Sequence, residues 1–498
     1  MVRADRTGGA QESCGHRAAV RAAVGAVKSG NADGAKGGRK VKASSEGSGE
    51  EKLPEVPAKP DKQGGEDLWQ RHKAERGVWS EKMLMALERG VKGGKWFSLI
   101  DKVASERTLS LAWEKVRSKA GACGVDGITV ARFEKDSQSR LLAVKEHLRK
   151  GSYRPKPVKR MRIPKAGGTE KRPLGIPTVT DRVVQQAVRM VLEPIVEKRF
   201  AEHSYGFRPG RGCHDALRRV KGQLVGGHPW VVDIDIKGCF DTIDQSRLMK
   251  LLKEDVADGG VLEVIESFLK AGVLEDGAWQ SSEEGTPQGG VISPLLANLY
   301  LNALDHLMKA QGHAMTRYAD DMVILCPSAE KAQQALETVR RWMESVHLSL
   351  HPEKTRIVHM DEKGAHFDFL GYRFMRTQKG KLLRLARPKS EKKLKEEVRR
   401  KTRRCNAHSM EVIVRRLNPQ LRGWFEYFKQ AYVTQHRSLD GWVRMRLRSI
   451  YRKRHRKRGR GRGSDHRRWP NRHFAELGLF SLEQAKAQAI SLLQGAKH

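Results

Sequence analysis

The chain has 498 residues, 38% of them hydrophobic, which leaves room for two to four domains and a substantial core. Lys and Arg total 96 against 58 Asp and Glu, a formal net charge of +38, and a long polyanion is the natural partner because each neutralised phosphate releases a counterion. No apolar run reaches about 18 residues and no cysteines stand at CxxC spacing, so we expect no membrane-spanning helix, secretory signal, zinc module or disulfide framework.

The N-terminal part separates into a tail and a helical segment. Residues 1–65 are rich in Gly, Ala, Ser, Lys and Glu and nearly lack aromatics, which predicts a disordered basic tail. From 66 to 155 apolar side chains recur at helical spacing, and helices are predicted over 109–116 and 141–148. The expected helical anchors near the start of this extension are Trp69, Trp79, Met83, Leu87, Trp96, Phe97 and Ile100.

The middle of the chain mixes strand and helix patterns. Residues 230–236 alternate apolar and polar side chains, which is typical of a half-buried strand with Asp233 and Asp235 on its polar face. Apolar runs flank an acidic centre across 315–325 and predict a β-hairpin with two acids at its turn. Ser328 is placed to cap a following helix that carries an apolar stripe. These elements predict an antiparallel sheet backed by helices, an α+β fold.

The acids at the ends of these strands suit nucleotidyl transfer. That reaction needs two divalent cations about 4 Å apart, and Mg²⁺ prefers carboxylate oxygens while keeping several waters. Asp235 at the end of one strand and Asp320 at the hairpin turn meet this need, and Asp321 is placed to assist. The alternative interpretation is that an Asp-Asp pair merely favours the turn.

The acidic pair lies in one of seven segments that resemble, in order, the seven blocks of the reverse transcriptases encoded by group II introns. One YxDD tetrapeptide is weak evidence, but seven ordered segments leave little room for chance. The resemblance implies a right-hand polymerase, with 66–155 extending the fingers and 156–375 forming the fingers and palm. The segments are IPK (163–165) with RPLGIPT (172–178), HSYGFRPG (203–210), DIKGCFD (235–241), GTPQGGVISP (285–294), RYADD (317–321), HPEKT (351–355) and FLGY (369–372).

The resemblance implies that three aspartates are the catalytic acids and hold two Mg²⁺ ions. Asp233 lies outside the matched segment and is secondary, and we interpret Asp241 and Asp244 as helix-start or turn residues. Phe240 matches the residue that blocks a ribose 2′-hydroxyl, so its ring would favour dNTPs over rNTPs; plain core packing is the alternative. The implied catalytic and metal-binding residues are Asp235, Asp320 and Asp321.

The remaining dNTP contacts are implied by the first, fourth and sixth segments. Lys165 and Arg172 bound a glycine-containing loop, and cations at each end of a flexible loop suit a cap over a triphosphate. Gln288 and Gly289 resemble the turn that supports the templating base and the incoming nucleotide. Lys354 resembles the basic residue proposed to protonate the leaving pyrophosphate, with a phosphate contact or a surface lysine as the alternatives.

The last part of the chain is helical. LRGWFEYF (421–428) and GWVRMRLR (441–448) resemble the maturase-specific segment of the same family, which implies a thumb or X domain over 376–463. Residues 464–498 then form an amphipathic tail. One amphipathic helix is predicted from an apolar stripe of Leu417, Leu421, Trp424, Phe428 and Tyr432.

A strongly basic run crosses residues 451–468. Block charge of this kind usually marks a solvated face, but beside a polymerase thumb we favour RNA binding through phosphates and 2′-hydroxyls. The candidate RNA-binding residues are Arg422, Trp424, Arg444, Arg446, Arg452, Lys453, Arg454 and Arg456.

The leading hypothesis is an RNA-directed DNA polymerase of group II intron type with maturase activity that assists splicing and retrohoming. Its partners would be group II intron RNA, an RNA template, a DNA primer, dNTPs and a DNA target site. The paired cysteines of an HNH endonuclease are missing, so we expect the form without that domain. We expect a bacterial, cytoplasmic and nucleoid-associated protein. The alternatives are a domesticated relative in DNA repair or defence and a non-catalytic splicing factor, and the intact aspartates speak against the second.

Overall fold

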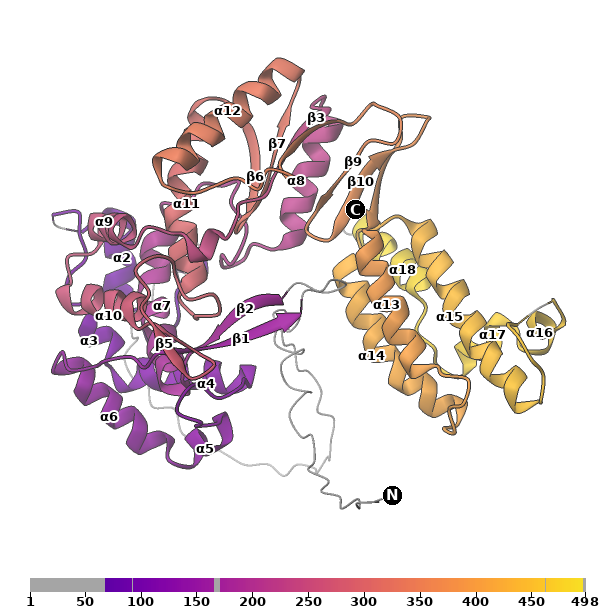
Figure 1. The fold of residues 1–498 in the computed structure, drawn as a ribbon, viewed down its shortest axis with the longest axis horizontal. Coiled ribbons are helices and arrows are strands. Elements are labelled where there is room, and N and C mark those ends of the chain that lie inside the picture. Colours follow the sequence, from indigo (N-terminus) through magenta and orange to yellow (C-terminus); the bar gives the residue numbers. More distant parts are fainter. Residues whose placement is uncertain (1–67, 92, 165–170, 462, 496–498) are drawn as a thin grey trace, which may run out of the picture.

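A computed structural model describes residues 68–91, 93–164, 171–461 and 463–495 of the chain. Figure 1 shows N-terminal helices, a central part that contains the main sheet, and a C-terminal helical bundle on the opposite side of the molecule from the N-terminal helices. The tail predicted over 1–65 lies outside the described residues. The mixture of antiparallel sheets and helices confirms the predicted α+β class.

Six helices precede the first strand: α1 (Leu68–His72), α2 (Glu81–Arg89), α3 (Ile100–Val103), α4 (Glu106–Lys119), α5 (Val130–Lys135) and α6 (Ser137–Arg149). The helices predicted over 109–116 and 141–148 lie within α4 and α6. The prediction of helical anchors was wrong at Phe97, whose side chain is 65% exposed, and at Trp79 and Trp96, which lie outside the helices in isolated β-bridges. α2 ends at Gly90, its C-cap, which has a positive φ, and Gly93 and Gly94 before Phe97 also have positive φ angles.

A small sheet follows, with strand order β2-β1-β4-β5. The hairpin β1 (Val158–Pro164) and β2 (Lys171–Ile176) is antiparallel, β1 runs parallel to β4 (Val273–Glu275), and β5 (Ala278–Gln280) closes the edge. The long helix α7 (Val179–Glu197) begins at Thr178, whose hydroxyl accepts a bond from Asp181 N, and it packs against α4. α9 (Gln245–Asp255) and α10 (Gly259–Lys270) complete this side of the molecule.

The main sheet has the order β6-β7-β3-β8, and all its neighbouring strands are antiparallel. Its strands are β3 (Trp230–Ile234), β6 (Ala314–Tyr318), β7 (Asp321–Cys326) and β8 (Arg356–His359). The predicted hairpin with acids at its turn is therefore confirmed as β6 and β7. Ser328 caps α12 (Ala329–Ser345) by accepting a bond from Lys331 N, as predicted.

Apolar side chains on the two faces of the main sheet enter different cores. Val232, Ile234 and Ile324 pack with α11 (Ser293–Ala310) and α12, while Val231, Val323 and Leu325 pack with α8 (Cys213–Val225) and the C-terminal bundle. The alternation of strand side chains between faces assigns Asp233 and Asp235 to the second face. The acids therefore lie on the sheet face that carries α8.

A third sheet connects the main sheet to the bundle. It consists of β9 (His366–Phe369), β10 (Tyr372–Arg376) and β11 (Leu382–Ala386) in the order β11-β10-β9. The bundle comprises α13 (Pro388–Lys401), α14 (Met410–Phe428), α15 (Val433–Arg454), α16 (Gly463–Arg468), α17 (Asn471–Glu476) and α18 (Leu482–Gly495). The predicted stripe from Leu417 to Phe428 is buried in α14, but Tyr432 lies beyond that helix, at the N-cap of α15.

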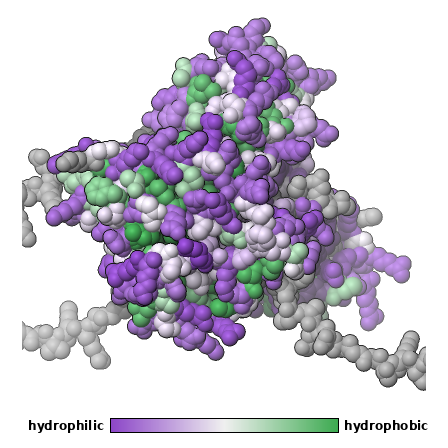
Figure 2. All heavy atoms as spheres, turned by 60° about the vertical axis from the view of Figure 1, so that its left-hand side comes forward, coloured by the Kyte–Doolittle hydropathy of each residue, from purple (hydrophilic) through white to green (hydrophobic). Residues whose placement is uncertain are grey.

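Polar surface dominates the face formed by the N-terminal helices and the centre of the molecule. Figure 2 shows hydrophilic residues over most of this face, with hydrophobic residues in scattered patches. Among the described residues, no helix has the length and apolar character to span a membrane.

Candidate active site

Three aspartates lie at the same end of the main sheet. Ile234 of β3 pairs with Met322 of β7, so Asp235 follows directly after β3 and Asp321 directly precedes Met322 on the neighbouring strand. Asp320 belongs to the two-residue turn that the Tyr318–Asp321 pair closes between β6 and β7. The structure thus brings the three predicted catalytic residues together.

The electrostatics of this end of the sheet favour a cation. Loss of solvent around the Asp321 carboxyl, together with the charges of Asp320 and Asp235, raises its pKa to about 6, although the side chain still opens to solvent. Burial also raises the pKa of Asp233 to about 6, partly offset by Arg356, whose Nε lies 3.6 Å from Asp233 Oδ2. Asp233 therefore has a cationic partner on the neighbouring strand β8.

Asp235 is held by the segment that follows α12. The Lys354 Nζ lies 3.4 Å from both carboxylate oxygens of Asp235, and His351 N donates to Asp235 O over 2.8 Å. The predicted pyrophosphate-protonating lysine is thus placed directly against a predicted metal ligand. In this arrangement its ammonium partly neutralises Asp235.

The donor set suits a hard divalent cation. Carboxylate oxygens are the ligands that Mg²⁺ prefers, and this ion keeps several waters and takes further oxygens from a bound triphosphate. Within the residues that the structure describes, no group of three or more His, Cys, Asp or Glu side chains is arranged to hold a metal ion by itself. The acids nevertheless act on one another, because Asp320 and Asp235 both raise the pKa of Asp321. They therefore fit an ion whose remaining ligands come from substrate and water.

Phe240 lies in the short 3-10 helix η1 (Cys239–Asp241), just after the strand that leads to Asp235. Its side chain is partly buried and packs against the main core. Thr286 N donates to Phe240 O over 2.7 Å, which ties the third matched segment to the fourth. Asp244 accepts a bond from Arg247 N and caps α9, as predicted for a helix-start residue.

The predicted nucleotide-supporting turn lies beside β2. Gly175 N donates to Gln288 O over 2.6 Å. Gly289 has a φ of +112°, and a Cβ there would lie 2.2 Å from Gly175 O, so only glycine fits this close approach. The backbone of Arg172 pairs with Ile163 in the same hairpin, whereas Lys165 lies outside the described residues. The structure thus joins the first and fourth matched segments.

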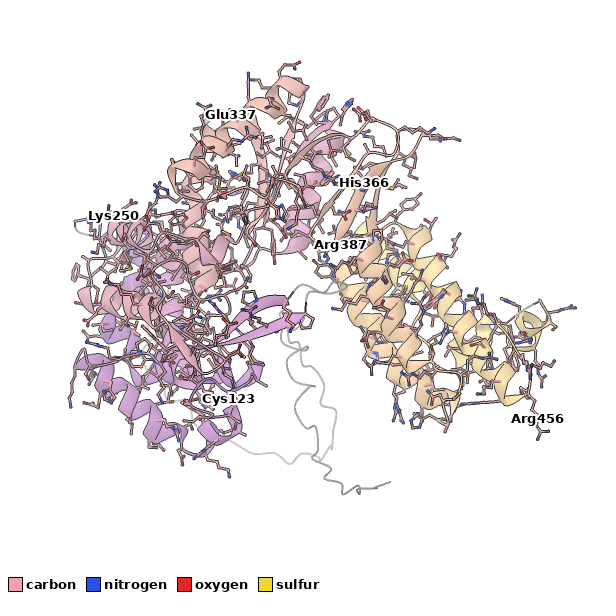
Figure 3. All side chains as sticks on the ribbon, viewed as in Figure 1. Cys123, Lys250, Glu337, His366, Arg387 and Arg456 are labelled. Carbon is pink, nitrogen blue, oxygen red and sulfur yellow. The ribbon has the colours of Figure 1, made fainter. Side chains whose placement is uncertain are left out.

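Sequence reasoning assigned no role to two arginines at this site. Arg317, which precedes the acidic turn, is fully buried and pairs with Asp305 of α11. The only signal for Arg317 in the sequence was a cation within the first strand of the predicted hairpin. Arg387 lies where the third sheet meets the bundle (Figure 3), and its charge lowers the pKa of Asp321. Arg387 is far from Asp321 in the chain, so no local pattern announced this proximity.

The candidate RNA-binding residues differ in their surroundings. Trp424 is only 8% exposed and packs on Phe428 in the bundle core, so the structure gives its ring a packing role. Arg446 donates to Thr402 O, and Arg452 donates to Asp465 Oδ2, so both guanidinium groups are engaged within the bundle.

The other candidates lie nearer the surface. Arg422 stacks over the Phe480 ring at 4.7 Å, and Arg444 is half-buried. Lys453, Arg454 and Arg456 are exposed, and Figure 3 shows Arg456 at the end of the bundle far from the main sheet.

Comparisons with known proteins agree with this geometry. Residues 163–374 match the family described as reverse transcriptase (RNA-dependent DNA polymerase), and residues 391–469 match the group II intron, maturase-specific domain. The group II intron-encoded protein LtrA of Lactococcus lactis subsp. cremoris is 44% identical over 195 residues, which are 39% of this chain and 32% of LtrA. Protein YkfC of Escherichia coli is 35% identical over 294 residues, covering 51% of this chain and 76% of YkfC.

The chain thus spans about a third of the length of LtrA and about three quarters of YkfC. A solved structure described as a partial Cas6-RT-Cas1–Cas2 complex matches with a TM-score of 0.33 and 26% identity, covering 50% of this chain and 41% of that one.

Proposed function

Because the chain belongs to the reverse transcriptase family and carries a group II intron maturase-specific domain, we propose that it polymerises DNA on an RNA template. The observation that carries this proposal is the meeting of Asp235, Asp320 and Asp321 at the ends of adjacent strands. In the reaction, the 3′-hydroxyl oxygen of the primer bonds to the α-phosphorus of a dNTP. The bond from that phosphorus to the oxygen bridging the α- and β-phosphates breaks, pyrophosphate leaves, and the proton of the hydroxyl passes to water.

The proposed cofactor is a pair of Mg²⁺ ions held by the same three aspartates. Bound there, the ions would activate the primer hydroxyl and neutralise charge on the triphosphate. Lys354 would supply a proton or a positive charge to the leaving pyrophosphate from its position beside Asp235. Phe240 would exclude a 2′-hydroxyl, and the turn at Gln288 and Gly289 would support the incoming nucleotide, with Lys165 and Arg172 over its phosphates.

We propose that the bundle binds structured group II intron RNA and assists its splicing. The match to the maturase-specific domain supports this role, as does the cationic surface at Lys453, Arg454 and Arg456. The relatives of this chain in two bacteria support a bacterial setting. In such a cell, the basic surface would keep the protein bound to nucleic acid. The DNA primer and the DNA target site are further proposed partners.

Primer extension tests the polymerase assignment directly. The purified chain is given an RNA template, an annealed DNA primer, dNTPs and Mg²⁺, and product length is read on a gel. We expect extension by the wild type and none above background by the Asp320→Ala/Asp321→Ala variant, because both carboxylates at the turn are gone. The matched control is Asp361→Ala/Glu362→Ala, which removes two adjacent exposed acids away from the site.

The same assay separates the polymerase from its main alternative. Undiminished extension by the variant at 320 and 321 would contradict the active-site assignment. A wild type that binds intron RNA tightly but extends no primer would favour the non-catalytic splicing factor.

A further inference from the structure

A fully buried ion pair lies directly behind the acidic turn. Arg317 and Asp305 both have 0% exposed side chains. Arg317 Nε donates to Asp305 Oδ1 over 2.8 Å, and Nη2 donates to Asp305 Oδ2 over 2.5 Å. Its Nη1 donates to Asn298 Oδ1 over 2.9 Å. Burying two charges carries a desolvation penalty that their attraction often only balances, so stability alone explains the pair poorly.

One further hydrogen bond connects this pair to the catalytic turn. Arg317 Nη1 also donates to Ala319 O over 3.0 Å. Ala319 has a φ of +58°, in the left-handed region that an L-residue with a Cβ adopts at a cost. The carbonyl of Ala319 belongs to the peptide group that leads into Asp320. Fixing this oxygen therefore fixes the plane of the peptide group between Ala319 and Asp320, and with it the position of the Asp320 Cα atom that carries the side chain.

Backbone from the second matched segment confines the turn from another side. Arg317 N donates to His203 O, and Tyr205 N donates to Arg317 O, each over 2.9 Å. A Cβ added to Gly206 would lie only 2.3 Å from Ala319 N, so this backbone approaches the turn very closely. Asn298 Nδ2 donates to Gly206 O over 2.7 Å, and Asn298 thus contacts both this backbone and the guanidinium.

We propose that Arg317 is a positioning residue that holds the turn in the conformation its acids need to bind metal. Asp305 and Asn298 orient the guanidinium, which in turn anchors the Ala319 carbonyl. The inference rests on the proposed polymerase function for its catalytic consequence. Metal binding by the acids can be measured without catalysis, so the two can be tested separately.

A purely structural role makes a different prediction, because a buried pair can be replaced as a unit. Exchanging both charges for apolar side chains of similar size is often neutral or stabilising. The variant Asp305→Leu/Arg317→Met therefore removes the carbonyl anchor without leaving an unpaired charge. The milder Arg317→Lys keeps the charge, but a single ammonium replaces the planar fork of donors that reaches Asp305, Asn298 and the Ala319 carbonyl together.

The first measurement is Mn²⁺ binding by electron paramagnetic resonance, using the full chain without nucleic acid. The second is steady-state primer extension with kcat and the KM for dNTP determined separately. We expect both variants to bind Mn²⁺ more weakly, about tenfold or more. We expect kcat to fall about 10²-fold with a smaller change in KM, the size of effect that a displacement of about 1 Å produces.

The matched control is Arg448→Lys in the bundle. Arg448 is 2% exposed and donates to Trp469 O and Asn471 Oδ1, so it is an equally buried arginine remote from the acids. We expect this variant to lose thermal stability while its Mn²⁺ affinity stays at the wild-type value.

The outcomes separate the hypotheses. A folded double variant with wild-type Mn²⁺ affinity and kcat would overturn the positioning role and leave a structural pair. If the double variant does not fold, Arg317→Lys decides the question by the same two readouts. A wild type that binds Mn²⁺ but extends no primer would contradict the proposed function while leaving the metal-positioning inference testable by binding. A wild type that binds no Mn²⁺ would overturn the inference itself.

Discussion

Negative charge gathered at the end of one sheet works against the stability of the folded chain. The Asp321 carboxyl has a pKa of about 6 in the folded protein against an ordinary value of 3.8, because solvent is lost and like charges are near. Between pH 3.8 and about pH 6, the Asp321 carboxyl is mostly protonated in the folded state and mostly ionised in the unfolded state. The stabilisation from that proton is present at low pH and is lost as the pH rises through about 6.

This direction of the pH dependence of stability gives a prediction for Asp321→Asn in the absence of divalent cations. At pH 7 the variant should melt at a higher temperature than the wild type, since it lacks the unfavourable charge. Below about pH 4 the difference should vanish, because the wild-type carboxyl is then protonated. Solvent screening limits the effect to on the order of 1 kcal/mol. Thermal denaturation in EDTA measures it, and a lower melting temperature of the variant at pH 7 would contradict it.

Phe240 carries a prediction about sugar selection. Its ring is partly buried and follows closely after Asp235, so the structure is compatible with both core packing and contact with a ribose. If the ring excludes a 2′-hydroxyl, Phe240→Ala should raise rNTP incorporation relative to dNTP incorporation, by about tenfold or more. Single-nucleotide extension with each substrate gives the ratio. An unchanged ratio together with a lower melting temperature would assign Phe240 to core packing.

At the scale of single residues, the sequence predicted those site residues whose position follows from their neighbours in the chain. Asp235 follows an alternating strand and Asp320 sits between two apolar runs, so periodicity and motif were enough. Arg317 was missed because a buried cation is explained only by its partner, and Asp305 lies on a different element. Arg387 was missed for the same reason, since it reaches the site from beyond the third sheet.

At the scale of elements, the catalytic region is assembled by close backbone contacts that only glycine permits. Gly289 shows this most clearly, since its missing side chain lets the turn after α10 and β5 lie against β2. Periodicity predicted β3, β6, β7 and α12 because each is long enough to show its repeat. It did not predict β4 and β5, because three-residue strands carry no recognisable period.

Gly289→Ala tests the importance of that contact. The new methyl group would meet Gly175 O at 2.2 Å, and that backbone oxygen cannot move without disturbing β2. We expect the KM for dNTP to rise several-fold and the melting temperature to fall. Gly312→Ala is the matched control, because Gly312 also has a positive φ, +73°, but has open space where the Cβ would stand.

The two glycine variants separate crowding from backbone strain. Both place an alanine at a positive φ, so each should lose about 1 kcal/mol or more of stability from strain. Only the variant at 289 should change the KM for dNTP. Equal kinetic effects from both substitutions would remove the turn from the nucleotide site.

At the scale of the whole molecule, positive charge is the dominant property, with a formal net charge of +38. The sequence predicted the order of the parts along the chain, since each has its own composition and period. It could not predict how α13 to α18 lie relative to the palm, because that arrangement depends on contacts between remote segments. It also placed Trp424 among RNA-binding residues, where its helical stripe already indicated a core position.

RNA binding should depend on the exposed cations of the bundle rather than on total charge. We expect Lys453→Ala/Arg454→Ala/Arg456→Ala to weaken binding to structured intron RNA. The slope of log K against log salt should flatten by about 2 to 3, from ~0.7–0.9 per lost phosphate contact. The control, Lys95→Ala/Lys102→Ala/Lys135→Ala, removes equal charge from exposed positions in the N-terminal part. Filter binding across salt concentrations measures both, and equal slopes for the two variants would leave the run as a solvated face.

The buried pair of Arg317 and Asp305 also restricts how this chain can vary. A guanidinium stays charged at any pH that a protein tolerates, so loss of either partner alone leaves an uncompensated charge in the core, at roughly 3–5 kcal/mol. Random mutagenesis under selection for folding would therefore rarely recover a single change that removes the charge at either position. The two positions therefore act as one mutational unit with respect to charge, because a route to an uncharged core at this place needs both residues to change together.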